Sequence, residues 1–384
     1  MDIDKLKQWF KCNDRVVSIL RELIRFNTSN PPGNEHAIAV YIADWLEERG
    51  FKTEVQDIEK GRSNVIACIG SGDRIGMILC GHMDVVPAVG TWNYPPFDGT
   101  VVGGRLYGRG SCDMKGGIAA MMAAAEFIAK NGLLSNKGLA LVFVCDEESK
   151  NKGMRGFIKK RLSADAAIIG EPTGLDINTG HRGFVLVSIK AQGVSCHSSQ
   201  PENGVNAIYI MADVIKEIRG YAKSLSNKVD KYLGKASLSV GTIRGGNKVN
   251  IVPDKCEILM ERRLLPGETA EDVIRELREW IGEDHRVTIK SYPELKAAVS
   301  EPESRLVKDM ADVVKGVLGK KPVIKSFPAG CEASFFINYL KIPTIIFGPG
   351  SLNQAHKADE WVAINDLIEA AKIYSLISYR YLRR

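Results

Sequence analysis

The sequence I-G-M-I-L-C-G-H-M-D, from Ile75 to Asp84, is the stretch that decides the fold. Its apolar run from Ile75 to Cys80 predicts a buried strand that ends in a turn. His82 and Asp84 then lie at the carboxyl end of that strand, where α/β sheets bind their ligands. Two residues apart on an extended segment, their side chains point the same way. The pair suits a metal-binding histidine oriented by a carboxylate, or two groups that only hydrogen-bond each other. The triplet alone does not decide between the two.

Two further apolar runs end in acidic residues. Leu139 to Cys145 is followed by Asp146-Glu147-Glu148, and Ala166 to Gly170 is followed by Glu171. Because helical segments separate these predicted strands, we expect an α/β sheet that gathers the acids at its carboxyl edge. Residues 85–110, rich in glycine, proline and aromatic residues, predict a long functional loop without regular structure.

The predicted order of strands and helices changes after His181. Residues 184–291 predict strand, helix, strand, strand, helix and strand, the order of a ferredoxin-like α+β module. Strand and helix then alternate again to the end of the chain. We therefore expect a discontinuous catalytic α/β domain of residues 1–181 and 294–384, with a second domain inserted at 182–293. With 384 residues the chain is also too long to form a single ordinary hydrophobic core, which favours two domains.

Composition and charge limit the kinds of protein and partner that the sequence can represent. The 45% hydrophobic and 26% charged residues are ordinary for a soluble globular protein. The basic residues behind the net charge of +6 are scattered, so we expect no nucleic-acid partner. No apolar run could span a bilayer and the N-terminus does not resemble a signal peptide, so we expect a cytoplasmic location and no membrane partner. The eight cysteines form no C-x-x-C pair and predict buried thiols.

The candidate catalytic and metal-binding residues of the predicted catalytic domain fall at or near predicted strand ends. They are His82, Asp84, Asp113, Glu147, Glu148, Glu171 and His356. Carboxylates that converge on one edge repel one another unless they are protonated or neutralised by cations. Imidazole and carboxylate ligands suit zinc, with cobalt or manganese as alternatives. Since the set exceeds what one catalytic zinc takes, we expect two ions about 3.5–4 Å apart. Asp113 could bridge them, and Glu147 and Glu148 could divide the roles of base and ligand.

Five motifs carry a family resemblance. They are Gly81-His82-Met83-Asp84, the stretch from Gly108 to Gly117, Asp146-Glu147-Glu148, Gly170-Glu171-Pro172-Thr173 and Ala355-His356. In order and spacing they resemble the dizinc deacylase and exopeptidase family, which includes acetylornithine deacetylase, succinyl-diaminopimelate desuccinylase and glutamate carboxypeptidase. The match covers nearly the whole chain. The resemblance implies a three-layer α/β zinc-peptidase-like catalytic domain with an inserted ferredoxin-like domain that serves as lid and dimerisation surface.

The resemblance also implies a ligand set for two zinc ions. His82 and Glu171 would bind one ion, Glu148 and His356 would bind the other, and Asp113 would bridge them.

Three further features follow from the same resemblance. Asp84 would orient His82, and Glu147 would act as general base and then as general acid. The peptide bond between Asp113 and Met114 would be cis.

The inserted domain carries matches of its own. His197, within Gly193 to Ser199, resembles the lid histidine that polarises the scissile carbonyl, in dimeric members at the partner's site. Asn250 and Arg263 match positions that look like contacts to a substrate carboxylate, a task that suits the planar fork of arginine. The resemblance implies a homodimer formed through this domain.

One departure from the pattern bears on the substrate. Near Gly330 the diaminopimelate and ornithine deacylases usually carry aspartate-alanine-arginine, whereas this chain reads Glu332-Ala333-Ser334. Our hypothesis is that Glu332 supplies negative charge for a substrate side-chain amine. We expect hydrolysis of the amide bond of an N-acyl-amino acid. The alternative is a metallo-exopeptidase, either a dipeptidase or a carboxypeptidase, acting on short peptides. Outside the enzymes, the alternative is a catalytically inactive binding protein on the same fold.

Overall fold

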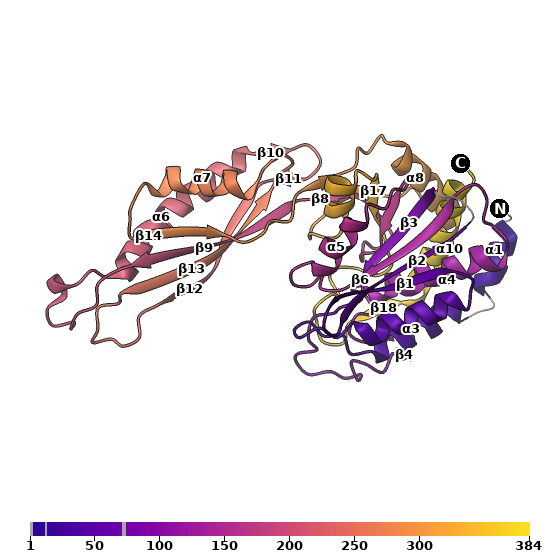
Figure 1. Cartoon of the computed structure of the whole chain (residues 1–384), viewed down its shortest axis with the longest axis horizontal. Coiled ribbons are helices and arrows are strands. Elements are labelled where there is room, and N and C mark those ends of the chain that lie inside the picture. Colours follow the sequence, from indigo (N-terminus) through magenta and orange to yellow (C-terminus); the bar gives the residue numbers. More distant parts are fainter. Residues whose placement is uncertain (1–2, 12–13, 71–73) are drawn as a thin grey trace. The chain divides into compact units, whose positions relative to one another are not determined.

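The computed structural model describes residues 3–11, 14–70 and 74–384, which form two compact units (Figure 1). The first unit comprises Met1–Gly180, Ser300–Phe327 and Cys331–Arg384, and the second comprises His181–Val299 and Pro328–Gly330. Within the described ranges, no helix is both long and apolar enough to cross a membrane. The seven cysteines in these ranges are free thiols, and Cys12 lies outside them. Five of the seven are buried, as predicted, whereas Cys68 and Cys196 are partly exposed.

A nine-stranded sheet forms the centre of the first unit. Its strands follow the order β1-β2-β6-β3-β7-β17-β8-β15, and β16 pairs with β8. They are β1 (Lys52–Glu59), β2 (Arg62–Ile69), β3 (Ile75–His82), β6 (Gly138–Val144), β7 (Ala167–Ile169), β8 (Ile177–His181), β15 (Ala298–Val299), β16 (Ile324–Phe327) and β17 (Thr344–Ile346). The neighbours β6, β3, β7 and β17 run parallel. Their carboxyl ends therefore share one edge of the sheet.

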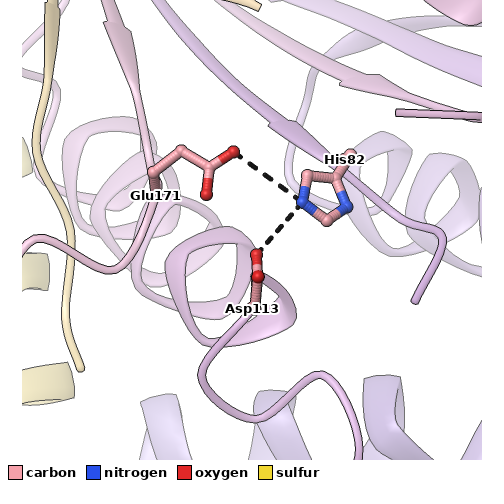
Figure 2. A group of neighbouring side chains, drawn as sticks. All are labelled: His82, Asp113 and Glu171. Carbon is pink, nitrogen blue, oxygen red and sulfur yellow. Dashed lines mark hydrogen bonds and ion pairs between the residues drawn. The ribbon is translucent and has the colours of Figure 1, made fainter. Parts of the chain in front are cut away.

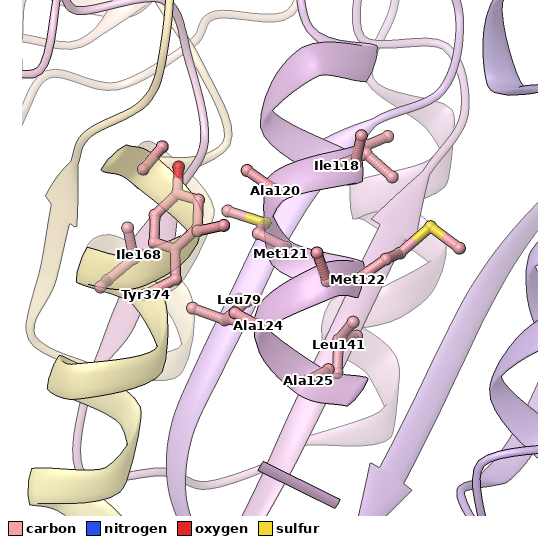
Figure 3. Packing of buried hydrophobic residues seen from close by; sticks show 14 of the residues in the cluster. Leu79, Ile118, Ala120, Met121, Met122, Ala124, Ala125, Leu141, Ile168 and Tyr374 are labelled. Carbon is pink, nitrogen blue, oxygen red and sulfur yellow. The ribbon is translucent and has the colours of Figure 1, made fainter. Parts of the chain in front are cut away.

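Helices bury the sheet's central strands. They are α1 (Ile3–Lys11), α2 (Arg15–Arg25), α3 (His36–Glu47), α4 (Lys115–Lys130), α5 (Lys152–Phe157), α8 (Arg305–Leu318), α9 (Ala333–Phe335) and α10 (Ile364–Leu382), with the short η1 (Ile158–Lys160) and η4 (Phe336–Leu340). Ile118 and Met121 of α4 belong to one core cluster with Leu79 of β3, Leu141 of β6 and Tyr374 of α10 (Figure 3). Every residue of β3 is buried, which explains its uninterrupted apolar run.

The prediction that residues 85–110 lack regular structure is wrong. They contain β4 (Thr100–Val102) and β5 (Arg105–Tyr107), which form a three-stranded sheet with β18 (Trp361–Ala363). The pairing of β5 with β18 joins segments far apart in the sequence, so no local pattern could reveal it. The small sheet ties this segment to the chain that follows His356.

The second unit has the predicted α+β order. Its antiparallel sheet runs β12-β13-β9-β14. The elements are β9 (Gly183–Gln192), η2 (Pro201–Asn203), α6 (Ala207–Ser224), η3 (Leu225–Asn227), β10 (Val229–Asp230), β11 (Gly234–Lys235), β12 (Ser237–Gly245), β13 (Lys255–Leu264), α7 (Ala270–Ile281) and β14 (Val287–Ser291). Apolar residues of α6 and α7 share one core with those of β9 and β13. The predicted fold class, an α/β domain with an α+β module inserted, is confirmed.

A close approach between α4 and the end of β7 depends on glycine. A Cβ added to Gly117 of α4 would lie 2.2 Å from the carbonyl oxygen of Gly170, which directly precedes Glu171. In contrast, Gly316 in α8 is exposed, and a Cβ there would meet nothing within 4 Å. Both glycines lie in helices, so replacing each by alanine changes helix propensity in the same way. Only the replacement at Gly117 also disturbs packing.

We expect Gly117→Ala to lower the free energy of unfolding by about 1–3 kcal/mol, because the added methyl group overpacks this contact. The control Gly316→Ala should raise it by about 0.5–1 kcal/mol, because alanine restricts the unfolded chain more than glycine does. Urea unfolding of both variants measures the difference. Equal stabilisation by both substitutions would show that the helix and strand end are not in tight contact.

Candidate metal centre

Three of the predicted ligands meet at the carboxyl edge of the large sheet (Figure 2). His82 ends β3, Asp113 comes just before α4, and Glu171 follows β7. Nε2 of His82 lies 3.3 Å from Oδ1 of Asp113 and 3.8 Å from Oε1 of Glu171. All three residues are buried, and they offer ligand atoms within 4.8 Å of one another. The Asp113–Met114 peptide bond is cis, as the resemblance implies.

A second group combines Asp113 with Glu148 and His356. Nε2 of His356 lies 3.1 Å from Oε1 of Glu148 and 3.4 Å from Oδ2 of Asp113. Their ligand atoms again lie within 4.8 Å of one another. Asp113 thus belongs to both groups, and its two carboxylate oxygens face different histidines, with Oδ1 toward His82 and Oδ2 toward His356.

Burial and mutual repulsion dominate the electrostatics of the carboxylates. Burial raises the pKa of Glu147 well above its ordinary value, and the charges of Glu332 and Glu148 raise it further. Burial likewise raises the pKa of Glu171 well above its ordinary value, with a further contribution from Asp113. Such groups ionise readily only when positive charge compensates them.

The pKa values of the two histidines are raised as well, but by the negative charge around them. Burial lowers the pKa of His82, and the hydrogen bond to Asp113 together with the charges of Glu147, Glu171 and Asp113 outweighs burial, so the pKa lies well above the ordinary value. Hydrogen bonds to Asp113 and Glu148 raise the pKa of His356 to about 10. The negative charge of the cluster therefore favours the protonated form of both rings. Bound cations would compensate the negative charge of these carboxylates. Imidazole nitrogens and carboxylate oxygens together form a ligand set that suits zinc and similar divalent ions.

Asp84 orients its neighbours in two ways. Nδ1 of His82 donates to the main-chain oxygen of Asp84 at 2.8 Å, whereas the carboxylate oxygen Oδ1 of Asp84 lies 3.8 Å from Nδ1. The contact that turns Nε2 of His82 toward Asp113 is therefore made by the backbone of Asp84. The carboxylate of Asp84 instead accepts hydrogen bonds from the amides of Glu147, at 3.0 Å, and Glu148, at 3.1 Å.

Sequence reasoning missed a buried network behind this carboxylate. Nδ2 of Asn30 donates to Asp84 at 2.9 Å and to Asp146 at 3.2 Å. Asp146 also accepts from Arg62 at 2.7 Å and from the amide of Lys152 at 3.1 Å. Asp146 has a φ of +66°, a conformation that nothing in the Asp-Glu-Glu triplet announces. Only the position of Asp146, between a predicted strand and two candidate site residues, hinted at this role.

Glu332 lies beside one of the predicted metal ligands, Glu171. Its side chain is fully buried, and together with Glu171 and Cys331 it forms a third group of close ligand atoms. Burial raises the pKa of Glu332 to about 7. The hypothesis that Glu332 supplies negative charge for a substrate side-chain amine stays a proposal.

The remaining predicted site residues belong to the second unit. His197 is exposed, with Nδ1 2.7 Å from Oγ of Ser199. Asn250 is also exposed and lies beside the same turn, since its main-chain oxygen accepts from the amide of Ser198 at 3.1 Å. Arg263, on β13, pairs with Glu261 at 2.7 Å. The structure therefore brings His197 and Asn250 together, and it groups the predicted metal ligands with Glu147 in the first unit.

Comparison with known proteins places the chain in a family. The profile of peptidase family M20/M25/M40 matches residues 78–380. An acetylornithine deacetylase of Aliivibrio fischeri is 33% identical over 358 residues, which cover 88% of this chain and 90% of that protein. The acetylornithine deacetylase of Photorhabdus laumondii is 34% identical over 349 residues, covering 87% of each chain.

Solved structures share the fold. An M20 family metallo-carboxypeptidase from Sulfolobus solfataricus has a TM-score of 0.81 at 22% identity, covering 96% of this chain and all of that one. A dinuclear metal-binding M20 peptidase from Bacillus subtilis has a TM-score of 0.71 at 17% identity, covering 98% of this chain and 99% of that one. With the family profile matching most of its length and relatives above 30% identity covering more than four fifths of it, the chain belongs to peptidase family M20/M25/M40 and is a hydrolase.

Proposed function

We propose that this protein hydrolyses the amide bond of an N-acyl-amino acid with the help of two divalent metal ions, most naturally zinc. The observation that carries the proposal is the position of Asp113, whose two oxygens face two separate histidine-carboxylate groups. The relatives named acetylornithine deacetylase support this substrate class, because they match over most of the chain.

The ligand set fits two ions. His82 and Glu171 would hold one, Glu148 and His356 the other, and Asp113 would contact both. Bound ions of this kind act as Lewis acids that polarise a carbonyl and lower the pKa of water.

Glu147 is the proposed general base. It lies outside both ligand groups, and the hydrogen bond from its amide to Asp84 fixes its backbone beside Glu148. A carboxylate whose pKa is raised above its ordinary value is a better acceptor of a proton from water, and it can later return that proton to the leaving amine. The raised pKa of Glu147 therefore suits both halves of the reaction.

We also assign roles to three residues of the second unit. We assign His197 to the substrate carbonyl, where a hydrogen-bond donor stabilises the negative charge that develops in the transition state. Arg263 and Asn250 would bind the substrate carboxylate, Arg263 through its planar fork. The homodimer through this unit remains part of the proposal.

A substrate screen tests the proposal. N-acetyl and N-succinyl amino acids, with lysine, ornithine and neutral side chains, are compared with dipeptides, and the metal content of the purified protein is measured alongside. We expect hydrolysis of N-acyl-amino acids by protein that holds two ions per chain. Cleavage of dipeptides alone would favour the metallo-exopeptidase alternative, and absence of any cleavage by protein holding two ions would favour the binding protein.

Glu147→Gln should reduce kcat by about 10²–10⁴-fold, the usual contribution of a general base. Metal content should stay at the wild-type level, because Glu147 is in neither ligand group. Steady-state kinetics and elemental analysis of the same sample measure both. Loss of an ion from the variant would identify Glu147 as a ligand and remove it from the role of base.

His197→Ala should lower kcat by about 10²–10³-fold without changing metal content, because it removes a donor to the developing oxyanion. His285→Ala is the matched control, since His285 is also an exposed histidine of the second unit and should leave kcat unchanged. An unaltered kcat in His197→Ala would exclude this residue from the site.

Metal binding to metal-free protein should release protons and tighten as pH rises. The reason is that His356, with a pKa of about 10, is protonated at neutral pH, whereas a metal ion binds the neutral ring. Calorimetric titrations with zinc at pH 7.5, in two buffers of different ionisation enthalpy, should give different heats. Identical heats in both buffers would show that His356 is not displaced from its proton by the ion.

A further inference from the structure

Glu360 is a buried acid that the reaction described above does not use. It directly precedes β18, lies four residues after His356 and has no exposed surface. Its carboxylate points at the loop from Gly108 to Asp113 and not at either ligand group. Oε1 accepts the amides of Cys112, at 2.9 Å, and Asp113, at 3.0 Å.

The second carboxylate oxygen and the main chain of Glu360 hold the rest of this loop. Oε2 accepts the amide of Gly110 at 3.1 Å and pairs with the guanidinium of Arg109. The main-chain oxygen of Glu360 accepts the amide of Gly108 at 2.9 Å. The whole stretch from Gly108 to Met114 is buried, and it forms neither helix nor strand. Its amides therefore need partners from outside, and Glu360 satisfies most of them.

Arg109 makes this arrangement compatible with a site for cations. The guanidinium is almost fully buried and neutralises the carboxylate that it contacts. Nη2 of Arg109 also donates to the main-chain oxygen of Pro87 at 3.3 Å, and Cζ of Arg109 lies 5.2 Å from the centre of the Trp92 ring. Glu360 therefore acts on the loop as a hydrogen-bond acceptor within a neutral pair and adds no net charge beside Asp113.

We infer that Glu360 is a positioning residue that fixes the main chain of Asp113 and thereby sets the geometry of both ligand groups at once. The inference rests on the proposed function only through the role of Asp113 as shared ligand. Since Glu360 follows His356 so closely in the chain, it also ties the segment that carries His356 to the loop that carries Asp113. Residues that hold a metal ligand in place typically change metal affinity or activity by about 10–100-fold when they are replaced.

The test compares Glu360→Gln with the wild type and with Glu126→Gln. An amide has one acceptor oxygen and cannot serve both pairs of donors, so Glu360→Gln should weaken binding of both zinc ions by about 10-fold or more. Glu126 of α4 is an equally buried glutamate, and it pairs with Arg15 and Arg49. Glu126→Gln should lower the melting temperature but leave both zinc affinities within twofold of wild type.

Zinc affinity of metal-free protein is measured by competition with a chromogenic chelator, and thermal unfolding is followed on the same samples. Zinc affinities within twofold of wild type in Glu360→Gln, whatever happens to its melting temperature, would overturn the inference and leave a purely structural role. If Glu360→Gln does not fold, Glu360→Asp takes its place, because the shorter side chain keeps the charge but cannot reach all four donors.

A double variant separates position from charge. Glu360→Gln combined with Arg109→Met removes the guanidinium that the single change leaves unpaired near the ions. If weak zinc binding persists in the double variant, position is the cause, whereas recovery of wild-type affinity would assign the effect to charge and overturn the inference. Wild-type protein that binds two ions but hydrolyses no substrate would refute the proposed function alone, since the affinity comparison does not use turnover.

Discussion

Repulsion among buried carboxylates is the constraint on which the rest of this structure depends. Asp113, Glu148 and Glu171 lie at one edge of the sheet in groups whose ligand atoms are within 4.8 Å of one another, and Glu147 adds another carboxylate. Left alone, these groups take up protons or recruit positive charge. The parallel strands fix where the acids stand, so the chain cannot relieve the repulsion by moving them apart. A fold that holds acidic side chains this close together is suited to binding cations.

Hydrogen bonds from backbone amides to buried carboxylates help to hold this arrangement in place. The carboxylate of Asp84 accepts the amides of Glu147 and Glu148, and the carboxylate of Glu360 accepts those of Cys112 and Asp113. In both cases a buried acid outside the ligand groups orients the loop that carries the site residues. Charge-assisted hydrogen bonds of this kind are stronger than neutral ones, which suits loops that must stay fixed against repulsion.

Sequence patterns predicted the residues at the carboxyl edge of the sheet, but not the buried residues that hold them in position. His82 and Glu171 could be placed because each follows an apolar run, and such runs mark buried strands whose ends converge. Glu360 could not be distinguished from a solvated acid, since its partners lie about 250 residues away in the chain and no periodicity records them. The burial of Glu332 could not be predicted for a related reason, because the residues around it do not reveal that its carboxyl group is fully buried.

The glycines beside Glu171 limit how this site can be altered by protein engineering. A Cβ on Gly348 would lie 2.4 Å from the carbonyl oxygen of Gly170 and 2.6 Å from that of Glu171, and Gly117 presses on the same peptide from α4. The backbone at this point is therefore enclosed by atoms that cannot yield. Libraries that seek new substrates gain nothing by varying these three glycines. If the proposed function holds, diversity is better placed on exposed side chains such as those of His197 and Asn250, which can be replaced without disturbing the backbone of the acids.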